Sequence, residues 1–296
     1  MDAMTSSAIY ARVLTAVHST LGQEAQPLAL LSSHGDGRPI FMVPGGDDDT
    51  SSLLPIARHL SCNGPVYGLR PRGRVGVSPP QNCVEDMAEY LIAAIMEVQA
   101  HGPYVLVGHS LGGLVVLEAA CRLLERGEQI SSLVLLDTYP HHSQWPWRLW
   151  IVSLAGRVKH HASQLTRLPL KQTLPYAAAK LETMWRHIRA RSGGEAAFLG
   201  AAEVEGERNG KPRRLHQASK LAWSYYRVRD YPGKMTFVQA VPRKWGDSLY
   251  PTDLIELWKR RVRHLDIHRV WSDHGAIVTL DAKSIAHVIS SCIRAD

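Results

Sequence analysis

Short apolar runs alternate with longer stretches of helical spacing through the first half of the chain. We expect the apolar runs to form strands at Leu28–Leu31, Pro39–Val43, Val66–Leu69, Tyr104–Val107 and Ser132–Leu136. The stretches between them repeat apolar residues at helical intervals, which predicts helices at Ser51–Leu60, Val84–Gln99 and Leu111–Arg126. Strands and helices that alternate in this way build a mostly parallel sheet with helices on both faces.

Three local features refine this pattern near the N-terminus. Apolar residues recur at every fourth position across Ile9–Leu21, which predicts an amphipathic helix. His34–Gly37 separates the first two expected strands and predicts a hairpin turn. Pro55 fits its helix only in the first turn, because proline has no N–H to donate further along.

The alternation stops at Tyr139 and resumes near Met235. From Tyr139 to about Asp230 the chain is polar and helical, with several tryptophans. After this segment we expect a strand at Met235–Ala240, a helix near Asp253–Val262, a strand at Leu265–Trp271 and a final helix at Ala282–Cys292. We therefore predict an N-terminal helix with the first strand and a linker at 1–37, a core in two parts at 38–138 and 233–296, and a helical lid inserted at 139–232.

Composition is that of an ordinary globular protein. Of the 296 residues, 45% are apolar and 21% are charged. No apolar run has the length of a membrane span, and the N-terminal residues lack the pattern of a secretory signal. The four cysteines show no metal-ligand spacing, so we expect reduced thiols, no bound metal and a cytoplasmic protein.

The positive charge is concentrated in the expected lid. Residues 139–230 contain 16 Lys/Arg and 6 Asp/Glu, whereas the rest of the chain contains 18 and 21. A basic surface attracts acidic partners. We see no nucleic-acid motif and expect neither nucleic acid nor membrane as a partner. The expected partner is therefore an acidic carrier protein or a phosphate-bearing arm. The alternative, to which we give equal weight, is that the basic segment is a solvated helical surface.

The run Gly108-His109-Ser110-Leu111-Gly112 falls between an expected strand and an expected helix. A sharp turn at this place holds a serine hydroxyl exposed above the sheet, and the flanking glycines leave room for it. Found in this context, the Gly-x-Ser-x-Gly pattern predicts a serine nucleophile, Ser110, in an α/β-hydrolase fold.

A serine hydroxyl needs a base to become nucleophilic, and in this fold the histidine follows the serine and the acid in the chain. His274 lies just past the last expected strand, where a loop can reach the nucleophile. His264 and His268 flank or enter that strand, and His287 lies within the final helix. The remaining downstream histidines fall in the expected lid, at 141, 142, 160, 161, 187 and 216. His274 is therefore the predicted base.

The acid has several candidates. Asp137 ends the strand after the nucleophile's helix, and Asp247 and Asp253 follow the strand at Met235–Ala240. Asp273 is adjacent to the histidine, so we expect it to point elsewhere. Position alone does not choose between Asp137 and Asp247.

Two backbone N–H groups are expected to bind the oxyanion of the tetrahedral intermediate. One is the N–H of Leu111, the residue after the nucleophile. The other comes from the turn at Pro44-Gly45-Gly46, and we predict the Gly45 N–H because proline has none. The acidic run Asp47–Asp49 is interpreted as a helix N-terminal cap rather than a metal site.

Together these stretches resemble the thioesterase domains that end nonribosomal peptide and polyketide synthases. The resemblance is dense from about Pro39 to Pro140 and returns around Ser272–Gly275. It is carried by Phe41-Met42-Val43-Pro44-Gly45-Gly46, Val66-Tyr67-Gly68-Leu69-Arg70-Pro71-Arg72-Gly73, Val84-Glu85-Asp86-Met87-Ala88, Gly102-Pro103-Tyr104, Gly108-His109-Ser110-Leu111-Gly112-Gly113 and Leu133-Val134-Leu135-Leu136-Asp137-Thr138-Tyr139-Pro140.

The resemblance implies release of an acyl chain from the phosphopantetheine thioester of a carrier protein or upstream synthase module, by hydrolysis or cyclisation. It also implies Asp137 as the acid, Gly45 and Leu111 as oxyanion donors, and no cofactor of the chain's own. The alternatives are a carboxylesterase or lipase that acts on oxygen esters, and a non-catalytic relative that only binds ligands. Trp145, Trp147 and Trp150 either line an acyl channel or pack a lid helix.

Overall fold

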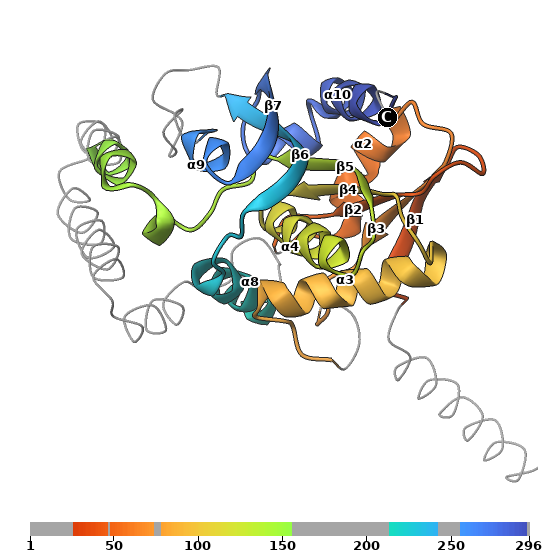
Figure 1. The fold of residues 1–296 in the computed structure, drawn as a ribbon, viewed down its shortest axis with the longest axis horizontal. Coiled ribbons are helices and arrows are strands. Elements are labelled where there is room, and N and C mark those ends of the chain that lie inside the picture. The colour runs from red at the N-terminus through yellow and green to blue at the C-terminus, as the bar shows by residue number, and fades with distance from the viewer. Residues whose placement is uncertain (1–25, 47, 74–77, 156–212, 242–254, 295–296) are drawn as a thin grey trace, which may run out of the picture.

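A computed structural model describes residues 26–46, 48–73, 78–155, 213–241 and 255–294. Its strands form one sheet in the order β1-β3-β2-β4-β5-β6-β7 (Figure 1). β1 is antiparallel to β3, and the other neighbouring pairs are parallel. The strands are β1 (Leu28–Ser33), β2 (Ile40–Val43), β3 (Pro65–Leu69), β4 (Tyr104–His109), β5 (Ile130–Leu136), β6 (Tyr231–Val241) and β7 (Val262–Trp271).

Helices cover both faces of this sheet. α3 and α4 lie on one face, and α2 and α10 lie on the other (Figure 1). Among the described residues, the helices are α2 (Leu54–His59), α3 (Val84–Val98), α4 (Leu111–Glu125), α8 (Arg213–Tyr225), α9 (Ile255–Lys259) and α10 (Ala282–Arg294), with 3-10 turns η1 (Thr50–Leu53), η2 (His142–Gln144) and η4 (Ala276–Val278). The predicted mostly parallel α/β architecture is confirmed.

The central strands are apolar on both sides because both faces are covered. In β4, Tyr104 and Leu106 belong to the core under α3 and α4, whereas Val105 and Val107 belong to the core under α2 and α10. Successive side chains of a strand point to opposite faces. This alternation explains why the strand appears in the sequence as a continuous apolar run.

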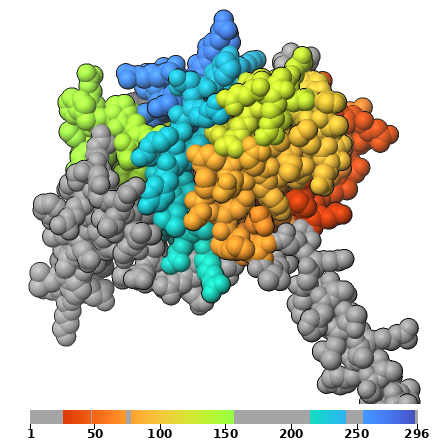
Figure 2. Space-filling model, turned by 60° about the horizontal axis from the view of Figure 1, so that its bottom comes forward, coloured from red at the N-terminus to blue at the C-terminus, as the bar shows by residue number. Residues whose placement is uncertain are grey.

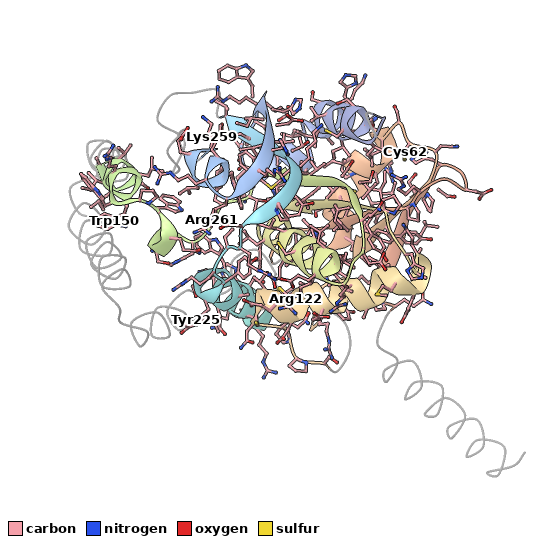
Figure 3. All side chains as sticks on the ribbon, in the orientation of Figure 1. Cys62, Arg122, Trp150, Tyr225, Lys259 and Arg261 are labelled. Carbon is pink, nitrogen blue, oxygen red and sulfur yellow. The ribbon has the colours of Figure 1, made fainter. Side chains whose placement is uncertain are left out.

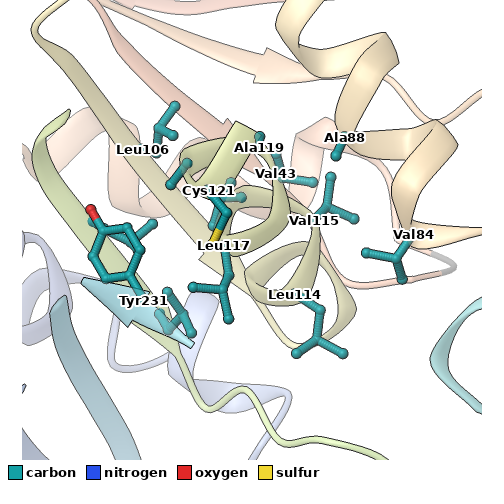
Figure 4. Close-up of a cluster of buried hydrophobic side chains, with 14 of the residues drawn as sticks. Val43, Val84, Ala88, Leu106, Leu114, Val115, Leu117, Ala119, Cys121 and Tyr231 are labelled. Carbon is teal, nitrogen blue, oxygen red and sulfur yellow. The ribbon is translucent and has the colours of Figure 1, made fainter. Parts of the chain in front are cut away.

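α4 is buried on most of its surface between the sheet and α3. Figure 4 shows Leu114, Val115 and Leu117 of this helix within the apolar cluster. On its outer side, Arg122 donates to Glu89 of α3 over 2.6 Å (Figure 3). Partly exposed ion pairs of this kind contribute little to stability, so the apolar contacts fix the helix. A rigid α4 matters because the expected nucleophile immediately precedes it.

Two local predictions at the N-terminal side have different outcomes. The hairpin at His34–Gly37 is wrong, since β3 lies between β1 and β2. The Gly37 N–H donates to the carbonyl of Asn63 over 2.5 Å, so this turn packs on the loop before β3 instead of closing a hairpin. Pro55 lies in the first turn of α2, as expected. The helix predicted at Ile9–Leu21 lies outside the described residues.

The segment predicted as a lid is described at its two ends. Residues 147–155 are helical, and α8 is at the other end. Residues 213–241 lie between the residues of α3 and α4 and residues 139–155 in the space-filling view (Figure 2). The boundaries 38–138, 139–232 and 233–296 stay predictions. None of the helices in the described ranges has both the length and the hydrophobicity to cross a membrane.

Candidate active site

Ser110 lies in the turn that joins β4 to α4. Its backbone has φ 54 and ψ −121, a conformation that costs energy in a residue with a side chain. The Ser110 N–H donates to the carbonyl of Leu136 over 3.0 Å, and the Gly113 N–H donates to the carbonyl of Ser110 over 3.1 Å. The last rung of the β4–β5 pairing and the first turn of α4 therefore hold the strained residue in place.

The two glycines of the motif are required by close backbone approach. A Cβ on Gly108 would lie 2.3 Å from the carbonyl oxygen of Gly112, and a Cβ on Gly112 would lie 2.3 Å from that of Pro44. Neither neighbour is a side chain that could rotate away. The turn therefore depends on both glycines, as the sequence pattern indicates.

Ser110, His274 and Asp137 are joined by two hydrogen bonds. His274 Nε2 is 3.0 Å from Ser110 Oγ, and His274 Nδ1 is 2.7 Å from Asp137 Oδ2. His274 follows β7, and its side chain is 45% exposed, whereas that of Asp137 is 5% exposed. The arrangement has the order of nucleophile, base and orienting acid that acyl transfer requires.

The Asp137 carboxylate is held by three donors. Oδ1 accepts from the Tyr139 hydroxyl over 2.8 Å and from the Ala240 N–H over 3.0 Å, while Oδ2 faces His274. Asp137 itself has a φ of 44, which aspartate tolerates better than most residues. These bonds fix which oxygen faces the histidine.

The other sequence candidates lie elsewhere. Asp247 and Asp253 fall outside the described residues, and Asp273 is exposed. His264 and His268 lie on β7, and His287 lies on α10. Of the lid histidines, His141 and His142 are buried, His216 lines the cleft described below, and those at 160, 161 and 187 are outside the described ranges.

A cleft of about 160 Å³ opens in front of the serine. Besides the three residues of the triad, it is lined by Gly46, Leu111, Tyr139, His216, Ser219, Lys220 and Trp223. Leu111, the residue predicted to supply one oxyanion donor, is among these lining residues. In the turn after β2, Gly46 lines the cleft, whereas the neighbouring Gly45 lies close to Asp48 and His109.

Asp49 caps the 3-10 turn η1, because its side chain accepts a hydrogen bond from the Thr50 N–H over 2.8 Å. This agrees with the interpretation of the acidic run Asp47–Asp49 as a helix cap.

The tryptophans of the lid segment differ in their surroundings. Trp145 is buried and its indole N–H donates to the carbonyl of Pro140, whereas Trp147 is 63% exposed. Among the described residues, the tryptophan that lines the cleft is Trp223 of α8. Packing therefore accounts for Trp145. Neither Trp147 nor Trp150 is among the described residues that line this cleft.

His109 connects the turn that contains Ser110 with the loop that contains His274. Its Nε2 donates to the backbone carbonyl of His274 over 3.0 Å, and its ring lies 5.0 Å from the His274 ring. The other nitrogen, Nδ1, faces Gly45 and has no hydrogen-bond partner among the described residues. Burial, followed by the nearby His274, lowers the pKa of His109 to about 4. A neutral His109 therefore holds the backbone of His274, the predicted base.

The depressed pKa predicts a pH-dependent stability. Unfolded His109 takes up a proton below its ordinary pKa of about 6.5, whereas folded His109 does so only near pH 4. The unfolded state binds more protons in this window, so the free energy of unfolding falls as the pH drops from about 6.5 to 4, by about 3 kcal/mol from this residue. Denaturant titrations of wild type and His109→Gln across this range measure the difference.

The variant should lose this part of the pH dependence because glutamine does not titrate, while its amide can still donate to the His274 carbonyl. His264→Gln, at an exposed position of β7, is the matched control and should keep the wild-type slope. Identical slopes for wild type and His109→Gln would refute the role of burial at this position.

Sequence reasoning missed three contributions to this site. Tyr139 follows Asp137 by two residues, so their proximity could have been suspected. His109 is inside the serine motif, yet its partner is a carbonyl 165 positions away, and no local pattern reveals it. The α8 residues that line the cleft repeat at helical intervals, a signal that was present but was hidden among the many polar residues of the lid.

Comparison with known proteins gives the family of the chain. The family model named thioesterase domain matches residues 38–295. The nonribosomal peptide synthetase btyA of Aspergillus terreus is 32% identical over 278 residues, which cover 92% of this chain and 28% of the relative. The inactive atromentin synthetase invA4 of Paxillus involutus is 34% identical over 134 residues, which cover 44% of this chain and 14% of the relative. The chain thus spans less than a third of the length of these curated relatives.

Solved structures share the fold. The NocB thioesterase domain, in a covalent complex with a fluorophosphonate nocardicin G analog, aligns with a TM-score of 0.59 and 17% identity over 90% of this chain and 99% of that chain. Identity this low supports the fold alone. The family match, in contrast, extends over most of the sequence. The chain belongs to the thioesterase-domain family.

Proposed function

We propose that the protein is a serine thioesterase that releases an acyl, peptidyl or polyketide chain through an acyl-Ser110 intermediate. The observation that carries the proposal is the hydrogen-bonded series from Ser110 to His274 to Asp137. Membership of the thioesterase-domain family supports the thioester as the bond that is cleaved.

The chemistry follows from the three side chains. His274 Nε2 takes the proton of the Ser110 hydroxyl while Oγ attacks the thioester carbonyl, and Asp137 stabilises the imidazolium. The tetrahedral intermediate collapses, the thiol leaves with the proton from His274, and the acyl group stays on Ser110. Water, or a nucleophile within the acyl chain, then loses a proton to His274 as it attacks the acyl carbonyl. His274 returns this proton to Ser110 Oγ when the acyl–Oγ bond breaks, and the product leaves by hydrolysis or cyclisation.

We propose two backbone donors for the oxyanion. The N–H of Leu111 opens α4 beside Ser110, where the helix dipole also favours negative charge. The second donor comes from the Gly45–Gly46 pair. Gly45 is the residue predicted from the sequence, and Gly46 is the member of the pair that lines the cleft.

The substrate is proposed to arrive on a partner. The curated relatives are longer synthetases, and this chain corresponds to a small part of each. A carrier protein or upstream synthase module would present the acyl group on its phosphopantetheine arm. The arm is then part of the substrate, and the triad needs no cofactor of its own.

An oxygen-ester substrate would use the same triad, so a matched pair of substrates tests the proposal. We expect kcat/KM for an acyl N-acetylcysteamine thioester to exceed that for the corresponding oxygen ester. The assay is release of free thiol or alcohol by wild type, with Ser110→Ala as the blank. A clear preference for the oxygen ester would identify a carboxylesterase instead.

A further inference from the structure

A second cavity lies at the edge of the sheet opposite the catalytic cleft. Tyr231 and Val262, which begin β6 and β7, line this cavity together with the C-terminal end of α4. The triad, in contrast, follows the carboxyl ends of β4, β5 and β7. β7 spans ten residues, so about 30 Å of strand separates the two sites. The cavity has a volume of about 640 Å³, which is within the range of ligand sites.

Among the described residues, six charged side chains line this cavity, which we call the basic groove. They are the four arginines Arg229, Arg260, Arg261 and Arg263 and the two carboxylates Glu125 and Asp230. Arg229 donates to Glu125. Arg261 donates to Asp230 over 3.4 Å. Each of these carboxylates therefore has an arginine partner, and two arginines of the groove remain in excess.

Arg260 and Arg263 carry this excess charge. Both residues are exposed, and neither side chain forms a hydrogen bond or an ion pair with a described residue. Their neighbour in the same basic run, Lys259, is paired with Glu256 over 2.7 Å (Figure 3). A guanidinium group stays charged at neutral pH, and its planar fork matches a carboxylate through two hydrogen bonds. The groove therefore offers two cations with the geometry to bind carboxylates.

Part of the wall of the groove is apolar. Leu124, Pro232 and Val262 line it beside the arginines. Protein–protein interfaces combine an apolar centre with arginine side chains. A nucleic acid would contact only the charges of the groove, and its closely spaced phosphates would also meet Glu125 and Asp230. A peptide in which acidic and apolar residues alternate matches both the arginines and the apolar wall.

We propose that the basic groove binds a peptide segment of a partner protein in which acidic residues alternate with apolar ones. Arg260 and Arg263 each pair with a carboxylate of this segment, and its apolar residues contact the apolar wall. The groove lies at the edge of the sheet away from Ser110, so the inference does not depend on the proposed function. It adds a docking site for a partner at the amino edge of the sheet.

The test measures the binding of three labelled probes by fluorescence anisotropy. Two are peptides of equal length, one with acidic residues that alternate with leucine and one with the corresponding amides in place of the acids. The third is a single-stranded DNA with the net charge of the acidic peptide. Each probe is titrated with wild type, with the groove variant Arg260→Gln/Arg263→Gln and with Arg260→Lys/Arg263→Lys. The matched control, Arg58→Gln/Arg214→Gln, removes two exposed arginines of α2 and α8 that do not line the groove.

We expect wild type to prefer the acidic peptide, and the groove variant to bind that peptide about 10- to 100-fold more weakly, the range for hydrogen bonds to a charged group. Arg260→Lys/Arg263→Lys should keep an intermediate affinity, because lysine retains the charge without the planar fork. The matched control loses the same number of charges and should bind like wild type. Thermal unfolding of each variant confirms that it is folded.

Three results would overturn the inference. They are equal affinity of wild type for the two peptides, an equal loss of affinity in the groove variant and the matched control, and tighter binding of the DNA than of the acidic peptide. The last result would identify the groove as a nucleic-acid site instead. The readout is binding and not turnover, so failure of the serine mechanism would leave it unchanged.

Discussion

Asp137→Asn is expected to lower kcat by about 10⁴-fold, the loss that the wrong histidine tautomer causes in a serine triad. The Oδ1 atom of Asp137 accepts from the Tyr139 hydroxyl and the Ala240 N–H, so an asparagine keeps its carbonyl oxygen there. Its NH₂ group then faces His274 Nδ1 and forces that nitrogen to accept. The proton moves to Nε2, which can no longer take the proton of Ser110.

The measurement is the single-turnover rate of thioester cleavage, with thermal unfolding to confirm that the variant is folded. Asp247→Asn is the informative comparison, because position in the sequence does not choose between Asp137 and Asp247 as the acid. We expect Asp247→Asn to stay within a few-fold of wild type. A larger loss in Asp247→Asn than in Asp137→Asn would reassign the acid.

Ser110→Ala is expected to lower kcat by about 10⁶-fold, since no other group takes over the attack. Residues of one triad act as a unit, so their effects are not additive. The double variant Ser110→Ala with Asp137→Asn should therefore be no slower than Ser110→Ala alone. The assay is thiol release from the acyl N-acetylcysteamine thioester, read against the uncatalysed rate. A further large loss in the double variant would mean that Asp137 acts independently of Ser110.

Local patterns were sufficient for the elements that carry the triad. β4 is a continuous apolar run because helices cover both of its faces, and Gly108 and Gly112 mark the turn because backbone atoms leave no space for a Cβ. His274 follows the last strand of a parallel sheet, so its position at the active-site edge could be predicted. These features depend on spacing within the chain.

The acid could not be chosen from spacing within the chain, because its position depends on how two neighbouring strands align. β5 and β6 are parallel neighbours, and Leu136 pairs with Val238, so their carboxyl ends reach the same edge of the sheet. An aspartate after either strand is near the histidine by topology alone. Tyr139 and Ala240 contact Asp137, whereas Asp247 lies outside the described residues, and such contacts appear only when the strands are in register.

The hairpin at His34–Gly37 failed for a related reason. Turn residues between two strands indicate a reversal but not the partner of each strand. Here β3 pairs with both β1 and β2, and the turn packs on Asn63. The contact of His109 with the His274 carbonyl is also invisible locally, because it joins two loops that the sheet brings together.

Covalent labelling with a fluorophosphonate tests the central claim most directly. The reagent reacts with an activated serine and leaves a stable phosphonyl adduct in place of the acyl group. After digestion, mass spectrometry should find one adduct per protein, on the peptide that contains Ser110, with thioester release lost in proportion to labelling. Ser110→Ala should remain unlabelled. A wild-type protein that releases thiol but carries no adduct, or carries it on another residue, would contradict the proposed mechanism.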